Sequence, residues 1–463
     1  MRKLFVLCIF ALVITLTVPA FAEVQNVKIS GEISLYGLYR DNYYTTGSGG
    51  GTPATLTVNL GRRDLAGATS NTFTNCKAED WYMQTTRLSV DADLTDNVIA
   101  RVSLFSESDW PVTESTAGHA SNPISSSAEK FDVELLEGYI VLKEMLYSQL
   151  TLKIGNQPVR IGRGLILGDG DLSGNGLIAS DYSISKSFNG IAGILDYNPL
   201  TVILGIVKIS DKDTTSDDVD GYLADFIYRF DAFNAVLDMS YVLAHYASPA
   251  GGLTTGPSML SQSADDVHGL DIILSGSPFE NLNGYIEFGK EFGDFVSNPA
   301  GGTSRDLDAW AFDVGGAYSI DNEYAPVVGL SYGRRSGEKA GTSSGDYKGW
   351  IPLFEDQKNG EILDPNTNVS WVKLALSARP IERLTTTIDY YLYRHDQKVV
   401  NADTTVRRAK RDLGDEVDMN LTYAYTDDLT FGLLYAIFWP GDSYTSGNDK
   451  KTVEAVASVN LKF

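Results

Sequence analysis

A serine within residues 329–333 has the G-x-S-x-G spacing that hydrolases use for a nucleophile. That motif works only on a sharp turn between a strand and a helix, where the hydroxyl is exposed to a histidine base. Here an alternating pattern continues through Ser331, which favours an uninterrupted strand. No spacing marks a base among the four histidines, which are His119, His245, His268 and His395. The chain also has no HExxH, phosphate-loop or paired-cysteine motif, so we expect no enzymatic activity.

A second chemical signal lies in residues 155–176, which read GNQPVRIGRGLILGDGDLSGNG. Arg160 and Arg163 carry guanidinium groups, which bind carboxylates and phosphates through paired hydrogen bonds. The apolar run Leu165-Ile166-Leu167 follows, and such a run in a connecting loop is stable only where other groups cover it. If the fold encloses a channel, the run favours insertion into the channel mouth, with the arginines at an anion-attracting constriction. The alternative places both arginines at the outer rim, paired with lipopolysaccharide phosphates or loop acids.

The same stretch contains half of a calcium-binding loop. Asp169, Asp171 and Ser173 occupy the first, third and fifth positions of such a loop, and Gly174 occupies the sixth. The twelfth position, where the loop needs a bidentate glutamate, is Ser180, and no helix is expected on either side. A flexible acidic turn is therefore the favoured interpretation, loop-bound calcium is the alternative, and no other cofactor is expected.

The elements that position these residues alternate between apolar and polar side chains. In the last ten residues, EAVASVNLKF, Leu461 and Phe463 fall on one face of a strand and Asn460 and Lys462 on the other. A strand that runs to the last residue needs a partner on both edges, and a closed barrel supplies both. The pattern predicts an all-β fold, a single transmembrane antiparallel β-barrel of about eighteen strands. They are expected near residues 27–44, 80–95, 97–110, 131–144, 148–158, 186–197, 199–211, 218–231, 233–247, 265–277, 281–294, 306–321, 323–335, 368–379, 383–397, 413–426, 429–440 and 451–463.

The gaps between these runs alternate between tight turns and long polar connections. In outer-membrane barrels the short turns face the periplasm and the long loops face outward, so both termini are expected on the periplasmic side. The expected extracellular loops are residues 45–79, 111–130, 159–185, 248–264, 336–367 and 398–412. Aromatic residues near the loop-side strand ends predict a girdle at the membrane interface, formed by Tyr43, Tyr44, Trp81, Tyr82, Trp110 and Trp439.

The N-terminus has the pattern of a cleaved secretory signal. Arg2 and Lys3 precede an apolar run that ends in Ala20-Phe21-Ala22, so residues 1–22 are expected to be removed and residues 23–463 to form the barrel. Cleavage leaves Cys76 as the one cysteine, which excludes an internal disulfide. The formal net charge of −23 argues against nucleic acid as a partner. Together these features predict the cell outer membrane as the location.

Alternation also predicts which charged residues line the channel. Over residues 413–426 the apolar face carries Val417 and Met419, which turns Glu416 and Asp418 inward. Most inward charges are expected to pair structurally across the lumen. Arg160 and Arg163 are expected to attract anions, opposed by Glu416, Asp418 and Glu137. On the other strands the same alternation turns these charged residues inward: Arg87, Arg101, Lys153, Glu137, Asp389, Glu32, Asp91, Asp238, Asp271, Glu287, Asp313 and Lys373.

Two segments resemble the alginate-export family of outer-membrane porins. Residues 413–443 are similar to its C-terminal signature, a G-D-E-hydrophobic-D run at residues 414–418 and a hairpin that ends in an aromatic-x-P-G turn at residues 438–441. Residues 150–163 are similar to a family strand and its basic-glycine loop, although Asn156 stands where the family usually has arginine. The resemblance implies an eighteen-stranded monomeric channel, and in its best-known member an arginine-lined lumen that passes a polyuronate. The matching residues in the second segment are Gly155, Gln157, Arg160, Gly162 and Arg163.

These observations predict a passive outer-membrane channel for export or diffusion of an anionic saccharide or another small solute. One alternative is a general porin with mild cation preference, which acids at the narrowest point favour. The other is a structural or adhesive barrel, which a plugged lumen favours. The expected partners are outer-membrane lipid, lipopolysaccharide, the solute and the barrel assembly machinery, for which Phe463 is the expected assembly signal.

Overall fold

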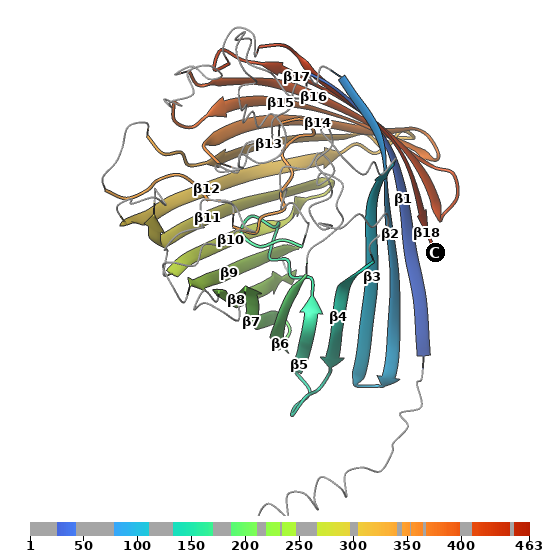
Figure 1. Ribbon diagram of the computed structural model, residues 1–463, viewed down its shortest axis with the longest axis vertical. Helices are drawn as coiled ribbons and strands as arrows, with labels where there is room; N and C mark the ends of the chain where they lie inside the picture. The colour runs from blue at the N-terminus through green and yellow to red at the C-terminus, as the bar shows by residue number, and fades with distance from the viewer. Residues whose placement is uncertain are drawn as a thin grey trace, which may run out of the picture.

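Eighteen antiparallel strands form one sheet that closes on itself (Figure 1). Each strand pairs with its neighbours in the sequence, and β1 (Asn26–Asp41) also pairs with β18 (Thr452–Lys462). The sheet is therefore a closed barrel, as the sequence predicts. The computed structural model describes residues 26–42, 78–110, 133–169, 187–210, 219–231, 234–246, 266–296, 304–339, 345–351, 353–363, 367–398, 410–444 and 449–463.

The strands differ in length, and all but one have at least the 9 residues that a tilted transmembrane strand needs. The shortest, β5 (Leu150–Gln157), has 8 residues and the longest, β2 (Ala78–Thr95), has 18. Within the described ranges no helix is long and apolar enough to cross a membrane. The other strands are β3 (Val98–Trp110), β4 (Glu134–Leu142), β6 (Phe188–Asp196), β7 (Leu200–Ser210), β8 (Val219–Phe230), β9 (Ala235–Tyr246), β10 (Asp266–Phe279), β11 (Leu282–Val296), β12 (Ser304–Ser319), β13 (Val327–Arg335), β14 (Val369–Ile381), β15 (Leu384–His395), β16 (Asp412–Ala424) and β17 (Leu429–Pro440).

The observed strands coincide with the eighteen expected ones, and the clearest difference is the start of β13. The sequence pattern placed this start at residue 323, whereas the strand begins at Val327. The turn is longer because the Asn322 side chain accepts a hydrogen bond from the Tyr324 backbone at 2.8 Å, and the Asn322 carbonyl accepts one from Ala325 at 3.0 Å. Pro326 follows and has no N–H to donate to a ladder, so pairing starts one residue later.

Within β13 the two faces of the barrel are clearly separated. Val328 and Leu330 are 40% and 61% exposed on the outer face, where lipid covers apolar side chains. Ser331 lies on the inner face and pairs with Gly315 on one side and Lys373 on the other. It therefore sits inside a continuous ladder and not on a strained turn, and the interpretation of this segment as a strand is confirmed.

The seam between β1 and β18 joins the two ends of the strand sequence. Gly31 and Phe463 exchange backbone hydrogen bonds of 2.8 and 3.0 Å, one residue beyond the end of β18. On the inner face Arg40 donates to Glu454 at 3.0 and 3.4 Å, and both side chains are about 1% exposed. The Phe463 ring lies on the outer face over Gly31, where an added Cβ would come within 2.4 Å of the ring. Closure therefore depends on both a buried ion pair and the terminal residue.

Deleting Phe463 should weaken this seam. The deletion removes both backbone hydrogen bonds to Gly31, each worth about 0.5–1.5 kcal/mol. We expect the free energy of unfolding to fall by about 1–3 kcal/mol, measured as the urea midpoint of the heat-modifiable band on gels. Phe463→Tyr is the control, because it keeps the backbone and the aromatic ring. An unchanged midpoint after the deletion would show that the seam does not depend on this residue.

Candidate functional site

Two segments leave the wall and run inside the ring of strands (Figure 1). The first insert, residues 158–169, follows β5. The second insert, residues 345–363, belongs to the connection between β13 and β14. Both were expected to be extracellular loops, apart from the apolar run of the first. The channel interior is therefore shaped by the inserts as well as by the wall.

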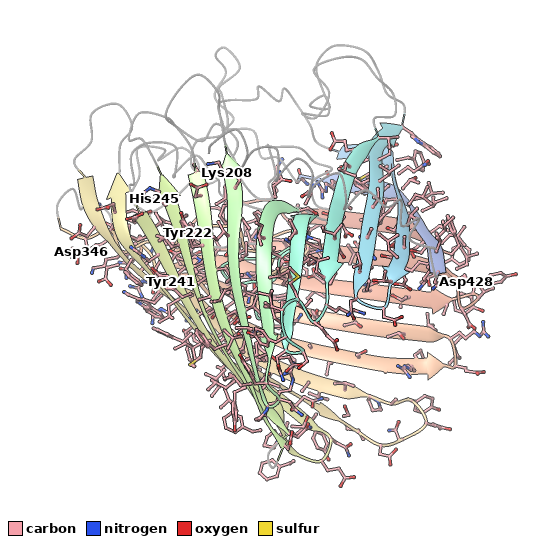
Figure 2. The ribbon with its side chains drawn as sticks, turned by 90° about the horizontal axis from the view of Figure 1, so that it is seen from below. Lys208, Tyr222, Tyr241, His245, Asp346 and Asp428 are labelled. Carbon is pink, nitrogen blue, oxygen red and sulfur yellow. The ribbon has the colours of Figure 1, made fainter. Side chains whose placement is uncertain are left out.

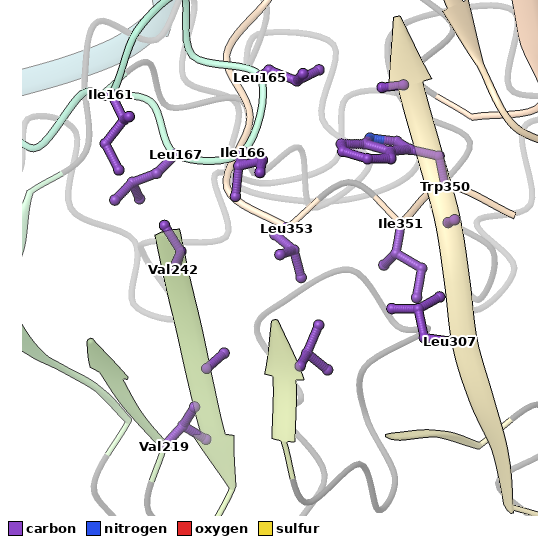
Figure 3. Close-up of a cluster of buried hydrophobic side chains, with 14 of the residues drawn as sticks. Ile161, Leu165, Ile166, Leu167, Val219, Val242, Leu307, Trp350, Ile351 and Leu353 are labelled. Atoms are coloured by element: carbon purple, nitrogen blue, oxygen red, sulfur yellow. The ribbon is translucent and has the colours of Figure 1, made fainter. Parts of the chain in front are cut away.

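The apolar run of the first insert forms the centre of a cluster inside the barrel (Figure 3). Leu165, Ile166 and Leu167 are at most 5% exposed. They pack with residues of the second insert and with the inner faces of β8, β9 and β12. Burying each such side chain contributes roughly 1.5–3 kcal/mol, so the cluster fixes both inserts in place, and the expected burial of this run is confirmed. The other members labelled in the figure are Ile161, Val219, Val242, Leu307, Trp350, Ile351 and Leu353.

The inserts are also joined to each other by their backbones. Leu167 and Phe354 form a parallel bridge, in which Gly168 donates to the Phe354 carbonyl at 2.8 Å and Phe354 donates to the Ile166 carbonyl at 3.0 Å. Gly164 has a φ of 81°, and a Cβ there would lie 1.9 Å from the Asp356 carboxylate. The first insert thus needs glycine at residue 164, one position beyond the family-like segment, so that the second insert can approach.

The predicted arginines lie in the first insert and take part in ion pairs. Arg160 donates to Asp169 at 3.2 Å and also pairs with Asp356. Arg163 donates to Glu287 at 3.2 Å, and its guanidinium carbon lies 3.5 Å from the centre of the Tyr285 ring. The Arg160 and Arg163 side chains nevertheless remain 45% and 37% exposed. Arg160 therefore pairs with acids of the inserts and Arg163 with an acid of the wall, and an anion-attracting constriction at these arginines stays a prediction.

Glu416 and Asp418 bind the second insert and do not face the arginines. Glu416 is fully buried and accepts backbone hydrogen bonds from Glu361, Ile362 and Leu363 at 2.7–2.8 Å. Asp418 accepts a weaker one from Glu361 at 3.2 Å. The family-like G-D-E-hydrophobic-D run of β16 is therefore the anchor for the far end of the second insert.

The part of the second insert that includes Ile351 and Gln357 is held by residues that the sequence analysis did not single out as anchors. Glu291, fully buried on β11, accepts a hydrogen bond from the Ile351 backbone at 2.8 Å. Arg335 forms two hydrogen bonds with Asp313, of 2.9 and 3.0 Å, and donates to Gln357 at 2.7 Å. The apolar residues 350–354 were the available signal, because such a run in a polar loop has to be covered.

Tyr347 marks the outer end of the second insert. Its backbone pairs with β12, donating to the Asp306 carbonyl at 2.7 Å and accepting from Asp308 at 2.8 Å. Burial, reinforced by nearby carboxylates, raises the pKa of Tyr347 to about 12. The phenol therefore stays neutral at physiological pH and serves as packing.

Most other predicted charges are matched on the inner wall. Glu137 pairs with both Arg87 and Arg101, and Arg101 also contacts Asp91 at 3.0 Å. Lys373 pairs with Asp389 at 2.7 Å. Lys153 differs, because in the part of the chain that the structure describes it has no carboxylate partner and lies 4.1 Å from the centre of the Tyr139 ring. Its charge is therefore available to a solute.

Three inward acids on neighbouring strands are incompletely matched. Asp225 and Ser240 are paired in register across β8 and β9, and Ser240 and Asp271 across β9 and β10. Asp238 lies close enough to Asp225 for a hydrogen bond between the two carboxyls. Even so, buried oxygens of all three acids have no hydrogen-bond partner among the described residues. This part of the wall is acidic.

The predicted calcium loop lies mostly outside the described residues. Asp169 is described and pairs with Arg160, whereas Asp171 and Ser173 are not described. Among the residues that are described, no group of three acidic, histidine or cysteine side chains is arranged to hold a metal ion. Calcium binding by the complete loop stays a prediction.

The fold and the inner wall define a class of protein. A closed β-barrel with apolar side chains outside, charges inside and long connections at one end is an outer-membrane channel. Solved porins share this fold. One is OccK2 (OpdF) of Pseudomonas aeruginosa in complex with glucuronate, which has 14% identity and a TM-score of 0.57, and the match covers 95% of this chain and 98% of that chain. OpdQ of the same organism has 14% identity, a TM-score of 0.55 and coverage of 95% and 98%. A BenF-like porin from Pseudomonas fluorescens Pf-5 has 11% identity, a TM-score of 0.55 and coverage of 95% and 100%.

The sequence itself is more specific than the fold. Residues 254–458 match the family described as alginate export. The match covers the G-D-E-hydrophobic-D run and its hairpin, and confirms over these residues the resemblance to the alginate-export family. No curated protein matches the chain. The protein is thus a channel of the outer membrane, with its C-terminal half matching the alginate export family.

Replacing Glu416 by alanine should release the far end of the second insert. The buried backbone N–H groups of Ile362 and Leu363 lose their acceptor, at a cost of about 1–3 kcal/mol for each group left unsatisfied. The N–H of Glu361 keeps only its longer hydrogen bond to Asp418. We expect a lower single-channel conductance in planar bilayers, because residues 361–363 move away from the wall and into the lumen. Asn420→Ala is the control, since Asn420 lies on the inner face of the same strand without a side-chain hydrogen bond in the described structure. Equal conductance in Glu416→Ala and wild type would contradict the anchoring role.

Proposed function

We propose that the channel carries small anionic solutes, an anionic saccharide among them, and that the first insert attracts them. The observation that supports this most directly is the presentation of Arg160 and Arg163 inside the barrel with more than a third of each side chain exposed. Guanidinium groups that keep unused donors bind carboxylates well even when one acid is already paired. Lys153, on the strand that leads into the first insert, adds an unmatched positive charge.

Transport through such a channel is passive. The inserts narrow the lumen, so a solute moves past side chains instead of through bulk water. Binding at the arginines has to be strong enough to admit an anion and weak enough to release it. Glu287 and Asp356 serve this purpose, because their pairing with Arg163 and Arg160 lowers the net positive charge that the solute meets. No covalent step is needed.

A general porin with cation preference is the second candidate function. The observation that favours it is the incompletely matched group Asp225, Asp238 and Asp271 on adjacent strands. Acids on a channel wall raise the local concentration of cations. The two functions therefore differ in which part of the lumen, the first insert or the wall of β8 to β10, controls the ion current.

The proposal includes partners at the outer surface. Lys208 pairs with Asp220 at 3.0 Å and His245 with Asp266 at 2.7 Å. Figure 2 shows Lys208 and His245 at the ends of their strands near the long connections. Such an exposed polar belt suits contact with lipopolysaccharide head groups. We further propose that the protein is a monomer, that residues 1–22 are a signal peptide, and that the assembly machinery reads Phe463.

The selectivity of the wild type and of Arg160→Ala with Arg163→Ala tests the proposed function. We expect the wild type to prefer anions and the double variant to lose at least half of that preference, measured as the reversal potential of a planar bilayer under a salt gradient. The control is Arg379→Ala with Arg383→Ala, which removes the same amount of charge from the end of the barrel that carries the short turns. Cation preference that the insert substitutions leave unchanged would reject the anion channel.

The acidic wall is tested separately with Asp225→Asn, Asp238→Asn and Asp271→Asn in one variant. These substitutions remove three ionisable carboxyl groups and keep the side-chain shape. For an anion channel we expect the reversal potential to move further toward the anion value, because repulsion in the lumen decreases. A wild type that prefers cations and loses this preference in the variant would establish the cation porin.

A further inference from the structure

The inner face of β6 to β8 carries a group of aliphatic side chains and glycines beside the inserts. Its inward positions include Ala192 and Ile194 on β6, Ile203, Gly205 and Val207 on β7, and Leu223 on β8. A water-filled channel gives apolar side chains nothing to contact, so an apolar wall needs something to cover it. The first insert covers only part of it, at Ile161 and Leu167.

A cavity of about 160 Å³, partly open to the lumen, lies between this wall and the inserts. Ile161 and Leu167 of the first insert and Phe354 of the second close one side. Its volume is close to that of an apolar protein cavity that binds benzene, and its lining is mostly apolar, as in small-molecule sites. The wall side is formed by Ala192, Ile194, Ile203, Val207, Leu223 and Val242.

The polar groups of the cavity are separated along its length. Lys153, Ala192, Gly205 and Leu223 are paired in register on β5, β6, β7 and β8 and form one row across the wall. Asp225 is the next inward residue on β8. Strands lie about 4.8 Å apart, so three strand spacings place the backbones of Lys153 and Leu223 roughly 14 Å from each other. The cavity therefore has a positive end and an apolar middle, and the buried carboxyl group of Asp225 lies beyond the far end of the row.

This arrangement selects the solute. Lys153 has no carboxylate partner among the described residues and lines the cavity together with the partly exposed Arg160. A carboxylate at this end leaves the remainder of the molecule over the aliphatic row. A second negative charge would lie over this aliphatic row, where none of the row's side chains offers a hydrogen-bond donor to compensate for its loss of water. A polyanion is therefore disfavoured here.

We propose that this cavity binds monocarboxylates with an uncharged, apolar body, with the carboxylate at Lys153 and the body against the wall of β6 to β8. The inference rests on the proposed function only in that an anionic solute enters the lumen. It names a different solute from the saccharide acid, because a sugar has no apolar body to bury against this wall.

Current block by hexanoate and by adipate tests the proposal. These acids have the same number of carbons, but adipate carries a second carboxylate. We expect hexanoate to reduce the current through the full-length channel in a planar bilayer, with a half-blocking concentration at least tenfold below that of adipate. Equal block by both acids, or stronger block by hexylammonium, would overturn the charge assignment. No block by hexanoate would overturn the site, whether the cavity is unused or filled by the chain itself.

Two variants locate the block. Lys153→Met removes the charge and keeps the length of the side chain. Gly205→Val fills the middle of the cavity, and a Cβ there meets Leu223 at 3.5 Å, which is an ordinary contact. The matched control is Gly193→Val, which adds the same volume on the outer face of β6, where a Cβ lies 3.6 Å from Leu152.

We expect Lys153→Met and Gly205→Val each to raise the half-blocking concentration of hexanoate at least tenfold, and Gly193→Val to leave it within twofold. Unchanged block in Lys153→Met would reject the site even if Gly205→Val failed to fold. Reversal potentials recorded on the same membranes keep the two proposals apart. Hexanoate block in a channel that prefers cations would reject the anion channel and retain the cavity site. Anion preference without hexanoate block would support the anion channel and reject the cavity site.

Discussion

The hydrogen-bonded closure of the sheet is the constraint on which the rest of the structure depends. In lipid an unpaired backbone group costs several kcal/mol, so a sheet can cross the membrane only without free edges. The pairing of β1 with β18 removes the last two edges, and the buried Arg40–Glu454 pair fixes its register. Once the ring is closed, each strand has a fixed inner face, and that decides which side chains can meet a solute.

The interior is built by inserting chain into this ring and holding it with buried acids. Glu416 accepts hydrogen bonds from three backbone N–H groups of the second insert and Glu291 accepts one, in place of a cation. A buried carboxyl group is costly unless donors satisfy it, so Glu416 is the stronger anchor of the two. The position of the inserts is therefore set by a few strong polar anchors, while the apolar cluster around Leu165 and Trp350 supplies most of the contact area.

The sequence predicted the wall far better than the interior. Period-two alternation is local, so it located all eighteen strands and turned Arg87, Glu137 and Asp389 inward. It could not show that Glu416 binds the backbone of residues 361–363, because that contact joins segments more than 50 positions apart. The apolar residues 165–167 did signal an insert. The equally apolar residues 350–354 were overlooked within a long connection taken to be polar.

The seam also constrains the order of folding. Arg40 and Glu454 are 414 positions apart in the sequence, and Asn460 and Glu32 are 428 apart. Contacts of such separation form late, because the entropy of closing so long a loop is lost before the contact stabilises anything. Neighbouring strands can pair as hairpins, but the ring cannot close until both distant strands are present. The barrel thus passes through an open-edged sheet, whose exposed edges need protection until β18 reaches β1.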